Sequence, residues 1–312
     1  MLITAQLVEA TTGHHLWSER YDRLFTDIFA LQEEIRRKIV THLALKLTDE
    51  DQARLAREYT SSPEAYDFLL RGWEYFNRQT KEANAQARQM FEKAIELDPS
   101  YAEAYVGMGW TYWLEWTFLW SPIPQTLEQA FILGQKARAV DDSLAQAHLL
   151  LGRLYLWKKQ YEQAIAEAER AIALAPNFAA GYAELGFILN WVGRPEEAIV
   201  LVEKAQRLDP RNPDFYYPLT LGQSYRLTRR HEEAIAAYKR TLQLNPHLPG
   251  PHAFLAVIYN ELGREEEARA EAAEVLRISP NFSVESFRQR IPFKDPAEVE
   301  RVLAALHEAG LK

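Results

Sequence analysis

Few residues of this chain of 312 are spaced as catalysis or metal binding requires. The stretch HEEA at His231 lacks the second histidine of the metalloprotease motif H-E-x-x-H, and GQSYR around Ser224 lacks the closing glycine of a nucleophile elbow. His14 and His15 are adjacent in a predicted strand, so their side chains point to opposite faces and suit a shared metal ion poorly. Acidic pairs such as Glu232–Glu233 begin predicted helices, where the positive helix end stabilises negative charge. We therefore predict no catalytic residue, no metal site and no cofactor, and we predict that the chain is not an enzyme.

The stretch WTYWLEWTFLW, residues 110–120, holds four of the eight tryptophans of the chain. At roughly 100° of rotation per residue, the four indoles share one broad face of a helix. Such a face could be core, a ligand groove, a contact for a partner helix or a membrane contact. Glu115 interrupts the stretch, and the apolar window around it is shorter than the roughly 20 residues that span a membrane. We therefore expect no contact with a membrane.

The composition favours a globular or solenoidal chain. A hydrophobic content of 47% with 26% charged residues supplies a large core without the bias of disordered or collagenous chains. The net charge of −8, from 36 basic and 44 acidic side chains spread along the sequence, argues against nucleic acid as a partner. The absence of cysteine excludes disulfide bonds and thiolate metal sites and suits a reducing compartment. Because the amino terminus shows no signal-peptide pattern, we expect a cytoplasmic protein.

An internal repeat organises most of the chain. Five similar stretches each end in a proline, at Pro99, Pro176, Pro210, Pro246 and Pro280, and the last three intervals are 34, 36 and 34 residues. A small residue recurs upstream of the last four prolines with the same intervals, at Gly152, Gly186, Gly222 and Ala256. Small residues let two helices approach closely, and a proline ends a helix because it lacks the amide hydrogen. The pattern predicts helical hairpins that bury a continuous core by stacking on their neighbours.

The unit AHLLLGRLYLWKKQYEQAIAEAERAIALAP resembles the tetratricopeptide repeat, whose signature is W-x2-L-G-x2-Y followed by A-x3-F and P. The resemblance implies an all-α fold, a right-handed superhelix of stacked hairpins over residues 63–282. The six predicted repeats span 63–100, 101–143, 144–178, 179–213, 214–248 and 249–282, and a capping helix is predicted within 283–312.

Two repeats are longer than the others. Gly109 and Ala130 are 21 residues apart where Gly152 and Ala164 are 12 apart, so the second repeat carries nine extra residues, and the first carries about three. The tryptophan stretch therefore extends a first helix into an insertion at one edge of the solenoid.

The amino-terminal part predicts a different structure. Alternating residues in LITAQLVEA and HHLWSERYD, separated by TTG, predict a β-hairpin within residues 1–25. Residues 26–62 are predicted to be linking helices, the first with an apolar stripe from Ile28 to Leu47 and Thr26 or Asp27 as its cap, the second in DEDQARLAREY. A lone hairpin is marginally stable, so this part is expected to be the end of a truncated α/β domain.

ITAQLVEATTGHHLWSERYDR followed by DIFALQEEIRRKIV resembles the end of the TolB-like domain of bacterial multidomain signalling proteins. In that family this domain joins a class III adenylate or guanylate cyclase domain, or a winged-helix DNA-binding domain, to a carboxy-terminal repeat array. The resemblance implies that an output domain is missing from this chain.

In tetratricopeptide arrays the first helix of each repeat lines a concave groove, at fixed positions around the small residue. Carried onto this sequence, the candidate ligand residues are Tyr66, Trp73, Phe76, Trp110, Trp113, Arg153, Phe187, Asn190, Gln223, Arg226 and Asn260. The groove is aromatic in the first two repeats and polar in the last. Chaperone-binding relatives hold a terminal carboxylate with lysine, asparagine and arginine, which this chain replaces at Leu69, Trp73, Val106 and Trp110. The resemblance therefore favours an apolar or amphipathic peptide, although the aromatic residues could equally pack on the helix of residues 27–47.

The sequence predicts a non-catalytic scaffold that binds a protein or peptide segment, or its own missing amino-terminal domain, as the regulatory part of a bacterial signalling protein. The alternative is the regulatory half of a class III cyclase, or of a winged-helix regulator. A free adaptor and a sugar-binding groove at Trp110 and Trp113 are weaker options. A homodimer could form through the exposed amino-terminal hairpin.

Overall fold

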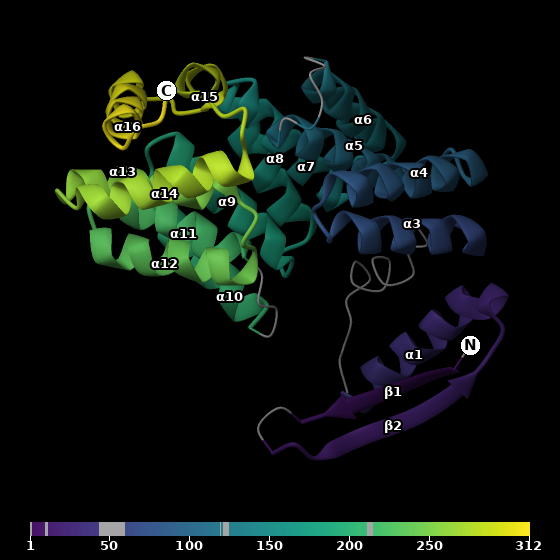
Figure 1. Ribbon diagram of the computed structural model, residues 1–312. Coiled ribbons are helices and arrows are strands. Elements are labelled where there is room, and N and C mark those ends of the chain that lie inside the picture. The colour runs from purple at the N-terminus through teal and green to yellow at the C-terminus, as the bar shows by residue number, and fades with distance from the viewer. Residues whose placement is uncertain (1, 10–11, 44–59, 119, 121–124, 211–214) are drawn as a thin grey trace. The chain divides into compact units, whose positions relative to one another are not determined.

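The computed structural model describes residues 2–9, 12–43, 60–118, 120, 125–210 and 215–312 (Figure 1). The chain forms two compact units, Met1–Met108 and Gly109–Lys312. None of the described helices is both long and apolar enough to span a membrane.

The first unit begins with the predicted hairpin. Strands β1 (Leu2–Val8) and β2 (His15–Asp22) pair antiparallel from Leu2 opposite Asp22 to Val8 opposite His15, which confirms the hairpin. After a short 3-10 turn, η1 (Phe25–Asp27), helix α1 (Ile28–His42) begins behind Asp27, one of its two predicted caps. The cap side chain makes no hydrogen bond to the helix. The predicted continuation of this helix to Leu47 and the predicted second linking helix, residues 49–59, lie on 44–59, outside the described residues.

Helices α3 (Pro63–Phe76) and α4 (Lys81–Leu97) complete this unit with the start of α5 (Ala102–Thr117). The Ser62 hydroxyl accepts a hydrogen bond from the Ala65 amide at 3.1 Å, so a side chain satisfies a free donor at the start of α3. The two helices touch at Gly72, where an added Cβ would lie 2.5 Å from Phe91 Cε1. Glycine is required there because the Phe91 ring occupies the space of any side chain.

The second unit is a stack of helix pairs. Its helices after α5 are α6 (Thr126–Val140), α7 (Ala145–Trp157), α8 (Tyr161–Leu174), α9 (Ala179–Trp191), α10 (Pro195–Leu208), α11 (Tyr216–Leu227), α12 (His231–Leu244), α13 (Pro249–Glu261) and α14 (Glu265–Ile278). Helices α7, α9, α11 and α13 each pack against the next helix in the chain. Helices α7, α9 and α11 also contact the first helix of the following pair directly. The all-α solenoid with a small amino-terminal sheet is thus confirmed.

The prolines that were predicted to end helices lie just beyond the observed helix ends. Helices α8, α10, α12 and α14 each end two residues before a repeat proline, at Leu174, Leu208, Leu244 and Ile278. The small residues also lie where predicted, since a Cβ on Gly152 would be 3.2 Å from the Ala164 carbonyl oxygen.

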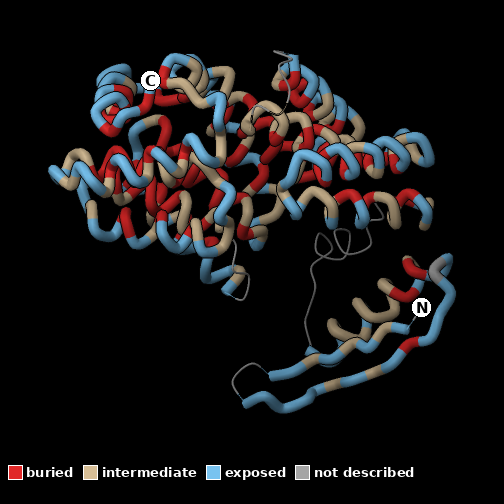
Figure 2. Tube along the Cα trace, in the orientation of Figure 1, coloured by how far each residue is buried: buried red, intermediate tan, exposed pale blue. Residues whose placement is uncertain are grey.

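The first helices of the pairs form the core of the second unit (Figure 2). Helix α9 is buried at every position from Gly181 to Trp191. Most helices of globular proteins instead leave one face exposed to solvent. The chain ends in α15 (Val284–Arg290), an extended stretch and α16 (Pro296–Glu308). Helix α16 packs against α13 and α15, and the Val284 amide donates to the Lys312 carbonyl at 2.8 Å.

Candidate functional site

A buried arginine surrounded by aromatic rings lies on the first helices of the second unit. Arg153 on α7 is 4% exposed, and its guanidinium carbon is 4.2 Å from the centre of the Phe187 ring. Three more rings lie within 6 Å of the same atom: Trp113 at 4.8 Å, Tyr216 at 5.1 Å and Trp110 at 5.6 Å. We call these five residues the arginine–aromatic cluster; it joins α5, α7, α9 and α11.

Glu184 on α9 neutralises this arginine. Arg153 Nε donates to Glu184 Oε1 at 2.7 Å, and both side chains are 5% exposed. The Tyr216 hydroxyl donates to Glu184 Oε2 at 2.9 Å, and Arg153 Nη2 contacts both residues. Burial alone would lower the pKa of Arg153, but the charge of Glu184 more than offsets it, so the pKa is raised. The arginine therefore stays a cation whose charge is matched inside the protein.

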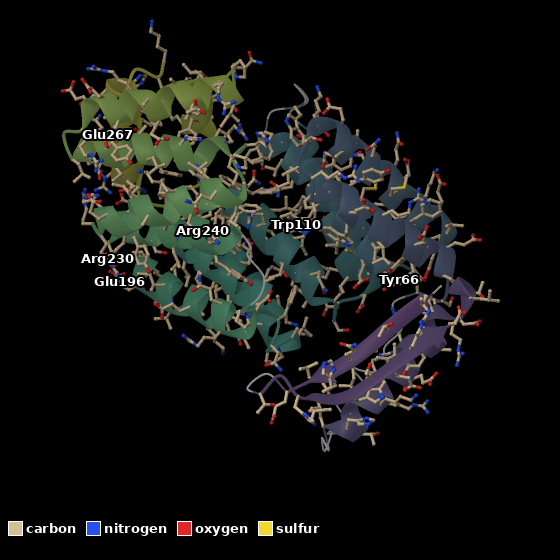
Figure 3. The ribbon with its side chains drawn as sticks, turned by 60° about the horizontal axis from the view of Figure 1, so that its bottom comes forward. Tyr66, Trp110, Glu196, Arg230, Arg240 and Glu267 are labelled. Atoms are coloured by element: carbon tan, nitrogen blue, oxygen red, sulfur yellow. The ribbon has the colours of Figure 1, made fainter. Side chains whose placement is uncertain are left out.

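The two tryptophans form the more exposed side of the cluster. The Trp110 and Trp113 rings meet edge to face at 5.3 Å, and both are half-buried. The indole N–H of Trp113 is buried and has no acceptor among the described residues. Figure 3 shows Trp110 among the side chains of neighbouring helices, whereas Arg230 and Glu196 lie at the outer edge of the second unit. This side of the cluster offers aromatic faces.

Two polar residues of the predicted groove hold helices together instead. Asn190 is fully buried; its amide donates to the Thr220 carbonyl at 2.9 Å and its oxygen accepts from the Ser224 hydroxyl at 2.8 Å. Gln223 accepts a hydrogen bond from the Tyr238 hydroxyl at 2.8 Å and is 4% exposed. In this structure Asn190 joins α9 to α11, and Gln223 joins α11 to α12.

The last two predicted groove residues contact the carboxy-terminal segment. Arg226 forms an ion pair of 2.6 Å with Glu298 of α16, and both are buried. Asn260 donates to the Ala305 carbonyl at 3.1 Å and to Glu308 at 2.7 Å. The predicted capping helix thus lies against residues that were expected to meet a ligand.

The predicted groove residues of the first unit pack locally. Trp73 meets Phe76 at 5.4 Å and the core residue Phe91 at 5.2 Å. The Tyr66 ring lies 5.6 Å from that of Phe29 in α1, and its hydroxyl accepts a hydrogen bond from Gln32. Tyr66, one of the aromatic residues predicted to line the groove, therefore contacts the amino-terminal helix α1.

The sequence interpretation missed Glu184 and Glu298. Glu184 stands two residues before the small residue of its repeat, where other repeats have Leu150, Thr220 and Phe254. A charged residue at a position that is otherwise uncharged was the available signal. Among the described residues, no histidine, aspartate and glutamate side chains form a group that could hold a metal ion.

Three family models described as tetratricopeptide repeat match residues 145–178, 192–249 and 226–291. The chain carries tetratricopeptide repeats. The crystal structure of the Cut9–Hcn1 hetero-tetramer of APC/C superposes with a TM-score of 0.55 at 19% identity, over 89% of this chain and 53% of that chain. The structure of pilF from Pseudomonas aeruginosa gives a TM-score of 0.46 at 20% identity, over 70% of this chain and 93% of that one.

One curated relative is similar in sequence. The Rhizobium meliloti (strain 1021) protein named "Putative adenylate cyclase 3" is 38% identical over 161 residues, which are 51% of this chain and 27% of the relative. The chain thus spans little more than a quarter of that protein. The tetratricopeptide fold is that of a protein-binding scaffold.

Proposed function

We propose that this chain is a non-catalytic scaffold that binds a protein segment at the arginine–aromatic cluster. The observation that carries the proposal is the pair of half-buried tryptophans, Trp110 and Trp113, held against a rigid buried ion pair. Aromatic side chains that are fixed in place contribute most of the affinity in many protein interfaces. The cytoplasm remains the expected compartment.

The chemistry of the cluster favours an apolar or amphipathic segment. The positive charge of Arg153 is already matched by Glu184, so the site offers little to a free carboxylate. The exposed sides of Trp110 and Trp113 suit aliphatic or aromatic side chains.

The proposal is tested with a displayed library of helical and extended peptides selected on the purified chain. For a selected peptide, Trp110→Ala and Trp113→Ala should each weaken the affinity at least tenfold, ~1.4 kcal/mol, by calorimetry. The matched control is Tyr225→Ala, which removes a half-buried ring that stacks on Arg230 at 4.3 Å. Equal losses in the control and the tryptophan variants would contradict the proposal. Binding on a glycan array that the tryptophan variants abolish would instead favour a sugar site.

A second candidate function is regulation of a nucleotide cyclase. It is supported by the 38% identity over 161 residues to the Rhizobium relative, whose name includes adenylate cyclase and which is much longer than this chain. On this proposal β1, β2 and α1 are the end of a TolB-like domain, and the natural partner of the repeats belongs to the same polypeptide.

The proposed regulation of a nucleotide cyclase is tested first by sequencing the gene upstream of this chain. A reading frame that continues upstream of the Met1 codon into a cyclase domain would support it, and a winged helix there would support transcriptional control. In a longer product with cyclase activity, Trp110→Ala should change the rate of cyclic nucleotide formation while Tyr225→Ala should not. A rate unaffected by Trp110→Ala would contradict regulation through the cluster.

We also propose that two copies can pair through the hairpin of β1 and β2. Light scattering after size exclusion tests this proposal, and a monomer at all concentrations contradicts it.

A further inference from the structure

The carboxy-terminal residues Val284–Lys312, which we call the tail, return to the first helices of the repeats. Residues Ile291, Pro292 and Phe293 of its extended stretch are all buried. The Phe293 ring lies 4.5 Å from that of Trp191 at the end of α9. This contact adds to the burial of the carboxy-terminal end of α9.

The extended stretch is held as a bound peptide would be. The Lys294 amide donates to the Trp191 carbonyl at 2.9 Å, and the Phe293 carbonyl accepts from the Tyr161 hydroxyl at 3.3 Å. Arg290 lies 4.3 Å from the centre of the Trp116 ring and donates to the Trp116 carbonyl at 2.8 Å. Main-chain hydrogen bonds together with one buried aromatic side chain are typical of peptide recognition.

The helical part of the tail is held by apolar side chains in the core, among them Val302, Leu303 and Leu306, and by charge and amide contacts. Glu298, in the first turn of α16, meets Arg226, and Arg301 lies 3.6 Å from Glu261 of α13. Asn260 bonds to the last turn of α16. An amphipathic helix with an acid near its start therefore covers two of the predicted ligand positions.

The fit between the tail and the repeats is incomplete. Three buried polar atoms in this region lack a hydrogen bond within the described residues: Arg290 Nε, Gln223 Nε2 and Arg226 Nη2. Burial lowers the pKa of Arg290 to about 10. Buried polar groups without partners weaken an interface, so another segment that bonded them would bind more tightly to the same surface.

We propose that the tail is an internal ligand of α9, α11 and α13 that exchanges with a partner protein segment of the same chemistry. That segment has an extended apolar and aromatic stretch followed by an amphipathic helix with an acid in its first turn. A tethered ligand acts at an effective concentration of roughly millimolar, so a partner must bind the free surface well below that value. The inference goes beyond the proposed function and does not depend on what binds the arginine–aromatic cluster.

The test uses a fluorescent synthetic peptide with the sequence of residues 284–312. The full chain with Phe293→Ala and Glu298→Gln weakens its own tail and keeps the surface of α9, α11 and α13. Fluorescence anisotropy should show that the peptide binds this variant at least ~10-fold more tightly than the unmodified chain. A peptide carrying the same two substitutions should bind neither chain tightly. The matched control is Glu300→Gln, an exposed residue of α16, which should leave peptide binding unchanged.

Equal peptide affinity for the variant and the unmodified chain, with both melting cooperatively, overturns the proposal. If the variant does not fold, a protease site inserted after Asn281 in the otherwise unmodified chain allows the tail to be cut after folding. The cut tail should co-elute with the repeats and be replaced by excess labelled peptide. A cut tail that does not exchange, or whose release unfolds the repeats, shows that it is a fixed part of the core. A dimer that dissociates when free peptide is added shows that the tails exchange between two copies of the chain. That result overturns the proposal that the tail binds its own chain.

Discussion

Arg153 and Glu184 form a buried ion pair between two successive repeats, with Nε and Oε1 2.7 Å apart and both side chains 5% exposed. The pair fixes α7 against α9, while the Tyr216 hydroxyl bonds the same carboxylate from α11. Three consecutive first helices thus meet at one buried polar centre. Such a centre adds little to the net stability, because two charges must lose their hydration.

The first prediction concerns this pair. Glu184→Leu leaves the Arg153 cation buried without a negative charge beside it, so the free energy of unfolding in urea should fall by about 3–5 kcal/mol. The double variant Arg153→Met with Glu184→Leu removes both charges and should recover most of the loss. The exposed pair Arg230 and Glu233 is the control, and Glu233→Gln should leave the transition unchanged. A double variant that is less stable than Glu184→Leu would contradict this account.

The second prediction concerns the contact between paired helices. A Cβ on Gly186 would lie 2.9 Å from Val202 Cγ2 and 3.1 Å from the Ala198 carbonyl oxygen. Gly186→Leu and Gly152→Leu should each destabilise the chain by about 1–3 kcal/mol, because the backbone cannot move aside without separating the helices. Gly250 has no atom within 4 Å of an added Cβ, so Gly250→Leu is the control. If all three variants unfold at the same temperature, the close helix contact at Gly152 and Gly186 does not determine the stability of the chain.

The helix ends could be predicted because a proline acts locally, as the end of α10 at Leu208 before Pro210 illustrates. The residues that share one face of each first helix could also be predicted, because the repeat interval fixes where residues such as Arg153 lie around the helix axis. What lies against that face could not be predicted. Arg290 and Trp116 are 174 residues apart, and no repeat pattern connects them. Glu184 was missed because the partner of a buried charge depends on side-chain geometry across two helices.

The third prediction separates a structural residue from a ligand residue. Asn190 was predicted to face a ligand, but it is fully buried and bonded to Thr220 and Ser224. Asn190→Ala should therefore lower the free energy of unfolding by about 1–3 kcal/mol, because the buried Thr220 carbonyl loses its amide donor and the Ser224 hydroxyl loses one of its two acceptors. Its affinity for a peptide that engages Trp110 should stay within twofold of the unmodified chain at temperatures where both are folded. A large loss of affinity with unchanged stability would restore Asn190 as a ligand residue.

The last prediction concerns the pH dependence of stability. His148 of α7 is 3% exposed; its Nδ1 lies 2.6 Å from Glu167 Oε2 and its Nε2 lies 2.8 Å from the Asp142 carbonyl oxygen. Both neighbours are acceptors, so both ring nitrogens act as donors when the ring is protonated. Burial alone would lower the pKa of His148, but Glu167 and the carbonyl more than offset it, so the pKa is raised above its usual 6.5.

Because the folded state holds this proton more tightly, the stabilisation by His148 is complete below pH 6.5 and disappears as the pH rises through the raised pKa. The free energy of unfolding should therefore decline from pH 6 toward pH 9, and His148→Gln should remove that part of the decline. The exposed His247 provides the control, and His247→Gln should keep the profile of the unmodified chain. Parallel profiles for the unmodified chain and His148→Gln would show that the ring contributes equally in both protonation states, against the geometry of its two acceptors.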